Sequence, residues 1–209
     1  MKVILLNGSP HPNGCTFTAL SEVERVLHAE GIETELLQLG ALPVRGCTGC
    51  GACAKRDGFC IFDDDIVNRY IEKVREADGF IVGSPVYYAS PNGSLISLLD
   101  RMFYCNGKTF EGKVGACVVS ARRAGTTASL DVLQKYMLIS KMPLAPSQYW
   151  NMVHGNTPEE VAQDAEGLQT MRTLGRNVAW MLKCIDAGKR AGITFPEAEM
   201  PRARTNFIR

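Results

Sequence analysis

Four closely spaced cysteines have the pattern of a metal or redox centre. Cys47, Cys50 and Cys53 follow one another at intervals of three, and Cys60 comes seven residues later. Thiolates at this spacing can surround a [4Fe–4S] cluster or a zinc ion, and the glycines between them leave the backbone free to wrap around it. A reduced loop without any metal is the third interpretation. The spacing alone leaves these three alternatives open.

A second stretch, residues 7–16, has the composition of an anion-binding loop. Its sequence is NGSPHPNGCT, and its small residues let backbone N–H groups face a phosphate at the start of a helix. The loop has neither the lysine of a P-loop nor a G-x-G-x-x-G pattern, which disfavours nucleoside triphosphates and a Rossmann-bound dinucleotide. A phosphate monoester such as flavin mononucleotide (FMN) remains. An ordinary glycine–proline turn is the plainer alternative.

Two further loops have the composition expected around a flat ligand. Residues 84–92 contain two prolines and the adjacent Tyr87 and Tyr88, against which an aromatic ring can lie. Packing of one tyrosine on a neighbouring helix is the alternative. Residues 120–127 are small and polar apart from Arg122 and Arg123. These arginines can offset a negative flavin or a cofactor phosphate, or can simply be solvated.

The remaining cysteines have simpler interpretations. Cys105, Cys117 and Cys184 lie in apolar patterns and are expected to be buried core thiols. Cys15 stands at the expected start of a helix, where its pKa can fall, although a small loop-filling residue is the simpler interpretation. No catalytic triad is expected, because the sequence has no G-x-S-x-G nucleophile motif.

The elements that must position these loops alternate between strand and helix. Short apolar runs predict buried strands at the five segments 2–6, 34–39, 79–83, 114–120 and 147–153. Apolar residues at helical spacing predict helices between them, which cover about 15–31, 66–74, 93–104, 130–142 and 157–187.

This alternation predicts an α/β fold, a doubly wound, five-stranded parallel sheet with helices on both faces. Ligands of such sheets bind at the carboxyl ends of the strands, where the loops described above begin. We expect one domain over residues 1–190 with a cysteine-rich insert at 46–60, followed by a tail at 191–209.

Composition argues against a nucleic-acid-binding, membrane-surface or membrane-spanning protein. The 209 residues carry a net charge of +1 and are 45% hydrophobic, without the basic excess typical of a nucleic-acid or membrane-surface protein. No apolar run approaches the roughly 20 residues of a membrane helix, and residues 1–6 are too short for a signal peptide. We expect a cytoplasmic protein, in which eight cysteines do not form a disulfide framework.

Three segments, taken in order, resemble a known family. Residues 8–16 (GSPHPNGCT), 84–101 (SPVYYASPNGSLISLLDR) and 120–127 (SARRAGTT) resemble the phosphate, ring and ring-edge loops of the NADPH-dependent FMN reductases, which are flavodoxin-like proteins. The cysteine motif resembles that of the iron–sulfur flavoprotein branch. The resemblance extends over about residues 1–150, and residues 204–209 look like the tail of relatives in that branch.

This resemblance implies the flavodoxin-like fold and an FMN site made by the three loops. Two positions depart from the family pattern, because relatives commonly have arginine at the position of His11 and asparagine at that of Cys15. The residues assigned to FMN are Ser9, His11, Asn13, Gly14, Cys15, Thr16, Phe17, Pro85, Val86, Tyr87, Tyr88, Ser90, Ser120, Ala121, Arg122, Arg123 and Gly125, and those assigned to the metal are Cys47, Cys50, Cys53 and Cys60.

Together the motifs predict an NAD(P)H-dependent FMN oxidoreductase in which the flavin carries the chemistry and no side chain is catalytic. NAD(P)H is the expected transient donor. The expected acceptor is a quinone or similar small molecule, a redox protein, or a [4Fe–4S] cluster in the chain itself. The alternatives are an electron carrier without substrate turnover and a zinc-stabilised binding module. We also expect a homodimer or homotetramer, no nucleic-acid partner and no membrane span.

Overall fold

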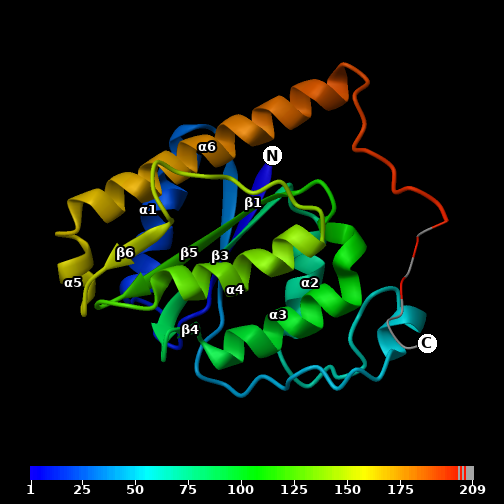
Figure 1. Ribbon diagram of the computed structural model, residues 1–209, viewed down its shortest axis with the longest axis horizontal. Coiled ribbons are helices and arrows are strands. Elements are labelled where there is room, and N and C mark those ends of the chain that lie inside the picture. The colour runs from blue at the N-terminus through cyan, green and yellow to red at the C-terminus, as the bar shows by residue number, and fades with distance from the viewer. Residues whose placement is uncertain (202, 204, 206–209) are drawn as a thin grey trace.

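The core of the fold is a parallel sheet with the strand order β2–β1–β3–β5–β6 (Figure 1). The computed structural model describes residues 1–201, 203 and 205. The order reverses beside β1, which is the switch point at which flavodoxin-like sheets bind their ligands. The predicted doubly wound, five-stranded parallel sheet is therefore confirmed. The strands are β1 (Lys2–Asn7), β2 (Glu33–Gln38), β3 (Gly79–Tyr87), β5 (Val114–Ala121) and β6 (Met152–His154).

Helices cover both faces of this sheet (Figure 1). On one face, α1 (Cys15–Ala29) and α6 (Ala165–Arg190) pack against Val3 and Leu5 of β1. On the other face, α2 (Val67–Arg75), α3 (Gly93–Asn106) and α4 (Thr126–Ile139) pack with Ile4 and Leu6 of the same strand. Successive side chains of a strand point to opposite faces, so one continuous apolar run supplies both halves of the core.

The third strand is longer than the sequence predicted. We expected it to end at Gly83, but β3 continues to Tyr87 and turns back into the short antiparallel strand β4 (Ser90–Pro91). The extension has a physical reason, because β3 stays in register with β5 as far as the pair Pro85 and Ser120. The expected loop is thus a tight hairpin whose tip projects beyond the sheet.

The long helix expected over residues 157–187 is broken in two. The first piece, α5 (Pro158–Val161), begins where expected, with Thr157 accepting a hydrogen bond from the Glu160 N–H. Asp164 then ends the helical run, because its carboxylate accepts hydrogen bonds from the N–H of Gly167 (2.9 Å) and that of His154 (2.7 Å). The side chain therefore caps α6 and ties it to the end of β6.

Other boundaries differ by a few residues. The expected strand at 147–153 starts only at Met152, since Ser147 forms a local turn by hydrogen bonding to the backbone of Tyr149. Helix α4 begins at Thr126, four residues before the predicted start. Two short 3₁₀ helices were not predicted, namely η1 (Ala52–Lys55) in the cysteine-rich insert and η2 (Gly107–Phe110) after α3.

Residues 191–201 follow α6 as an exposed segment without helix or strand. Of the expected tail motif, Arg204 and residues 206–209 lie outside the described residues. Within the described part of the chain, no helix is both long enough and apolar enough to cross a membrane.

The close packing of α6 on α1 gives a test of the fold. A Cβ atom on Gly175 would lie 2.8 Å from the Cβ of Val26, whereas one on Gly188 meets nothing closer than 3.8 Å. We expect Gly175→Ala to lower the free energy of unfolding by about 1–3 kcal/mol through overpacking. Gly188→Ala, the matched control in the same helix, should raise it by up to about 1 kcal/mol. Urea denaturation measures both, and equal effects would contradict this packing.

Candidate functional site

The loop after β1 is held in one conformation by a buried asparagine. The Nδ2 atom of Asn7 donates to Gln38 Oε1 (2.7 Å) and to the carbonyl of His11 (3.3 Å), and its Oδ1 accepts from the Ser9 N–H (3.2 Å). Gln38 in turn donates to the Ser9 carbonyl at 2.7 Å. Sequence analysis did not single out Asn7 or Gln38. The signal for Asn7 was its place as the first polar residue after a buried strand.

Helix α1 opens directly from this loop and offers free N–H groups. Its N-cap residue is Gly14, no described side chain caps it, and its first turn contains no acidic residue. The first N–H groups of an α-helix have no partner within the helix, and the helix dipole favours an anion there. The loop and the helix start therefore suit a phosphate group.

Cys15, the first residue of α1, fits the simpler of its two interpretations. Partial burial raises the pKa of its thiol, and the expected fall at a helix start is not found. The Sγ atom lies 3.7 Å from the carbonyl oxygen of Gly155, to which it donates. Loss of hydration is the largest cause of this shift, so Cys15 serves as a small packed residue at the start of α1.

Two hydrogen bonds join the three loops at the carboxyl edge of the sheet. Asn92, at the N-terminus of α3, donates from Nδ2 to the carbonyl of Gly8 at 2.8 Å. The buried hydroxyls of Thr16 and Ser120 share a hydrogen bond of 2.8 Å. The structure therefore brings together the segments that the sequence assigned to one ligand. It also shows that the side chain of Thr16 contacts Ser120, which leaves its backbone N–H for a phosphate.

The hairpin between β3 and β4 carries its tyrosines into solvent. Tyr88 is fully exposed and Tyr87 is 43% exposed, so packing on a neighbouring helix is excluded for Tyr88. Tyr88 and Ala89 both have positive φ angles, 51° and 57°, a conformation that side chains other than glycine seldom adopt. A Cβ atom on Gly125 would lie 2.6 Å from the Cα of Ala89, so only glycine lets the third loop approach this tip.

The residues assigned to FMN differ in how exposed they are to solvent. Ser9, Thr16, Ser120 and Ala121 are buried. The hydroxyls of Thr16 and Ser120 join two loops, whereas that of Ser9 accepts from the His11 N–H in its own loop. Arg122 and Arg123 are exposed at the third loop. The Gly-Lys-Thr tripeptide at residues 107–109 lies in η2 after α3, away from any strand-to-helix loop, and forms no phosphate loop. The other assigned positions are half-buried or exposed and comprise His11, Asn13, Gly14, Cys15, Phe17, Pro85, Val86, Tyr87, Tyr88, Ser90 and Gly125.

The four cysteines of the insert line one small cavity together with a fifth cysteine, Cys105 of α3. Cys53 and Cys60 are buried, whereas Cys47 and Cys50 are exposed. Among the described residues, no three His, Cys, Asp or Glu side chains converge on a single point as a finished metal site. The insert nevertheless gathers all four predicted thiols around one space.

A buried arginine anchors this insert to the body of the protein. Arg101 of α3 is 1% exposed, and its Nε donates to Cys60 Sγ at 3.3 Å. Its other nitrogens donate to the carbonyls of Arg45 (3.2 Å) and Phe62 (2.8 Å), and form an ion pair with Asp65. The guanidinium thus holds the insert on both sides of its last cysteine.

The electrostatics of the insert suit thiolate ligands. The backbone N–H of Ala52 and the hydroxyl of Thr48 lower the pKa of the Cys50 thiol. Burial tends to lower the pKa of Arg101, yet Asp65 and Cys60 raise it overall, so the guanidinium stays positive beside the sulfur atoms. Sulfur donors, N–H groups and a fixed positive charge are the environment of an iron–sulfur or zinc centre, and the donor set therefore fits such a group.

Of the three cysteines expected to be buried core thiols, one is buried and two are not. Cys117 is buried as expected, and burial raises the pKa of its thiol. Cys184 of α6, however, is exposed. Cys105 is only half-buried and reaches the cysteine cavity at the end of α3. No local pattern showed this, since the contact joins segments far apart in the chain.

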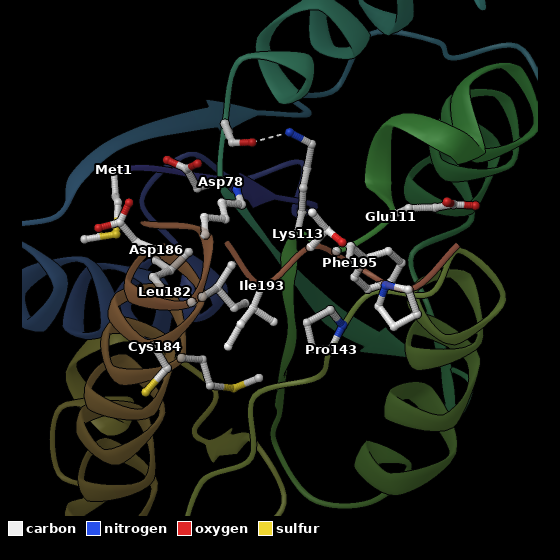
Figure 2. Close-up of a pocket in the computed structure, with 18 of the residues that line it drawn as sticks. Met1, Asp78, Glu111, Lys113, Pro143, Leu182, Cys184, Asp186, Ile193 and Phe195 are labelled. Carbon is white, nitrogen blue, oxygen red and sulfur yellow. Dashed lines mark hydrogen bonds between the residues drawn. The ribbon is translucent and has the colours of Figure 1, made fainter. Parts of the chain in front are cut away.

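A separate cavity of about 670 Å³ lies at the opposite edge of the sheet (Figure 2). Its lining includes Asp78 and Lys113, which precede β3 and β5, and the apolar side chains of Leu182, Ile193 and Phe195. Figure 2 shows the Lys113 side chain donating to a backbone carbonyl. None of the residues assigned to FMN or the metal lines this cavity, which lies at the amino ends of the strands.

The sequence is similar to those of known proteins over most of its length. The chain is 35% identical over 193 residues to an iron–sulfur flavoprotein of Methanocaldococcus jannaschii, covering 88% of this chain and 99% of that protein. It is 30% identical over 194 residues to an iron–sulfur flavoprotein of Methanosarcina thermophila, covering 90% and 99%.

The fold is also shared with solved structures. A flavodoxin from the Archaea superposes with a TM-score of 0.60 at 15% identity, covering 88% of this chain and 99% of that one. The apo form of an NADH:FMN oxidoreductase superposes with a TM-score of 0.61 at 17% identity, covering 88% and 89%. Residues 1–157 match the sequence profile of NADPH-dependent FMN reductase. The chain therefore belongs to the NADPH-dependent FMN reductase family, as a flavodoxin-like oxidoreductase similar to the iron–sulfur flavoproteins.

Proposed function

We propose that the chain is an NAD(P)H-dependent oxidoreductase that binds FMN at the three loops and a [4Fe–4S] cluster at Cys47, Cys50, Cys53 and Cys60. The observation that carries this proposal is that one helix supports both sites. At its start, α3 holds the phosphate loop through Asn92. Two to three turns later, the same helix holds the cysteine insert through Arg101.

The chain's own residues bind and orient the flavin. Backbone N–H groups at the start of α1 and the hydroxyl of Ser9 would hold the phosphate, while the hairpin with Tyr87 and Tyr88 would flank the ring. When bound, FMN supplies hydride acceptance and single-electron transfer. Arg122 and Arg123 are exposed beside the ring loop and are available to a phosphate of the flavin or of the nicotinamide.

The insert supplies sulfur ligands and a positive charge for a cluster. Gly49 and Gly51 have φ angles of 65° and 70° with no atom within 4 Å of an added Cβ, so the backbone around the first three cysteines has room to adjust. A cluster supplies a one-electron carrier next to the two-electron flavin. Zinc fits the same donor set but would perform no redox work, so we favour iron and sulfide.

The partners follow from the same chemistry. We propose a reduced nicotinamide as donor, and a quinone, a similar small acceptor or a redox protein as acceptor, in the cytoplasm. The second candidate function is an electron carrier without turnover of its own, which the exposed Cys47 and Cys50 favour because they leave the insert open to a partner protein.

We also propose a homodimer or homotetramer, in which exposed side chains such as Trp150, Trp180 and Ile139 become covered.

The phosphate loop can be tested with one added charge. Asn13→Asp changes an exposed side chain into a carboxylate next to the start of α1. We expect the affinity for FMN to fall about tenfold, since about 1.4 kcal/mol of repulsion suffices. Riboflavin lacks the phosphate and serves as the matched control ligand, so its affinity should not change. Fluorescence titration of the apoprotein measures both, and an equal loss for riboflavin would argue against this loop as the phosphate site.

The cysteine centre can be tested by metal analysis of anaerobically purified protein. We expect flavin absorbance with a broad brown shoulder, and about four iron and four sulfide per chain. Cys53→Ser should lose most of the iron and keep FMN, whereas Cys117→Ser changes a fully buried thiol outside the centre and should keep both. Zinc, or flavin without iron, would refute the cluster and leave a simple FMN reductase.

Donor specificity separates the enzyme from the carrier. We expect NADPH or NADH, added anaerobically to the FMN-loaded protein, to bleach the visible absorbance of the flavin with saturable kinetics. Saturation reports a binding step before hydride transfer. A flavin that dithionite reduces but neither nicotinamide does would favour the electron carrier. Stopped-flow absorbance distinguishes the two results.

A further inference from the structure

Cys105 is a fifth thiol in the cysteine centre, and neither the cluster nor the flavin needs it. It lies at the end of α3 and lines the same cavity as the four cysteines of the insert. Cys53 and Cys60, the two buried cysteines of the insert, line this small cavity beside it. The insert lies directly against this end of α3, because an added Cβ on Gly58 would be 2.9 Å from the carbonyl oxygen of Cys105.

Two observations select Cys53 as the partner of Cys105. Cys53 and Cys105 both line a hollow of about 1390 Å³ that opens beside the insert, and Cys60 does not. This hollow therefore gives a small oxidant in solution a route to this pair of residues. The sulfur of Cys60, in contrast, already accepts a hydrogen bond from the buried Arg101 at 3.3 Å.

We infer that Cys53 and Cys105 form a disulfide when the centre holds no metal and meets a peroxide. One thiolate attacks hydrogen peroxide, so that an S–O bond forms, the O–O bond breaks and the displaced hydroxide takes up a proton to become water. The second thiol then attacks the resulting sulfenic acid, the S–S bond forms and a second water leaves. Two thiols are oxidised, and one peroxide is reduced to two waters.

The disulfide would protect a ligand of the proposed cluster. A sulfenic acid without a nearby thiol proceeds to sulfinic acid, which ordinary thiols do not reverse. A disulfide, by comparison, returns to two thiols on reduction. Cys105 would thus keep Cys53 recoverable after the centre loses its metal. This consequence rests on the proposed function, whereas formation of the bond itself does not.

The test maps disulfides in the full-length chain, freed of iron and treated with hydrogen peroxide. We expect the count of free thiols to fall from eight to about six per chain. Trypsin releases Cys105 in residues 102–108, Cys60 in residues 57–69, and the other three cysteines of the insert in residues 46–55. A link between 46–55 and 102–108 is expected, with fragment ions that assign it to Cys53. Cys184→Ser, which removes an exposed thiol outside the centre, should keep this link.

Links of residues 46–55 to 57–69, or links between chains in place of the expected one, would overturn the inference. A second readout is iron uptake after reduction with dithiothreitol. The treated wild-type protein should recover the uptake of the untreated protein, and Cys105→Ser should recover less than about half of it. Full recovery by Cys105→Ser would overturn the protective role. Untreated protein that takes up no iron would contradict the proposed cluster, while the peptide map still decides the disulfide.

Discussion

The arrangement of both candidate sites depends on the buried charge of Arg101. A guanidinium removed from water is costly unless every donor finds a partner. Here Asp65 supplies the countercharge, and the remaining donors reach Cys60 and two backbone carbonyls of the insert. The insert has few apolar side chains of its own in the core. The same hydrogen bonds that satisfy the arginine therefore also determine where the cysteines lie.

Helix α3 connects the cysteine insert to the phosphate loop at the start of the same helix. Its N-terminal residue, Asn92, caps the helix by accepting from the Ser94 N–H at 3.1 Å and also donates to the phosphate loop. A change in the position of α3 would consequently shift both the phosphate loop and the cysteine cavity. Since α3 packs in the core through Leu95, Leu98 and Met102, such a shift is resisted by the whole face of the sheet.

The sequence predicted the parts of this structure that follow local rules. Buried strands appear in the sequence as apolar runs, and the loops after them as segments of small polar residues. The sequence therefore predicted the sheet and the three loops at its carboxyl edge. The sequence analysis did not predict that the helix breaks at Asp164, because Asp also occurs inside helices. The break follows from the hydrogen bond that its carboxylate accepts from the His154 N–H, which is a contact between separate elements. Nor could a buried Arg101 be read from sequence, since arginine is usually exposed.

Cys105 shows why a motif defines a centre only in part. The spacing of the first four cysteines follows from the short loop that carries them, and it can be recognised without any structure. The fifth cysteine lies on α3, 45 residues after Cys60. The insert can lie against this helix because Gly58 has a φ of 73° and no side chain. An added side chain at that position would clash with the backbone of α3 at Cys105, although the spacing of the motif itself would be unchanged. The chemistry of the insert is therefore set jointly by its own spacing and by the helix on which it rests.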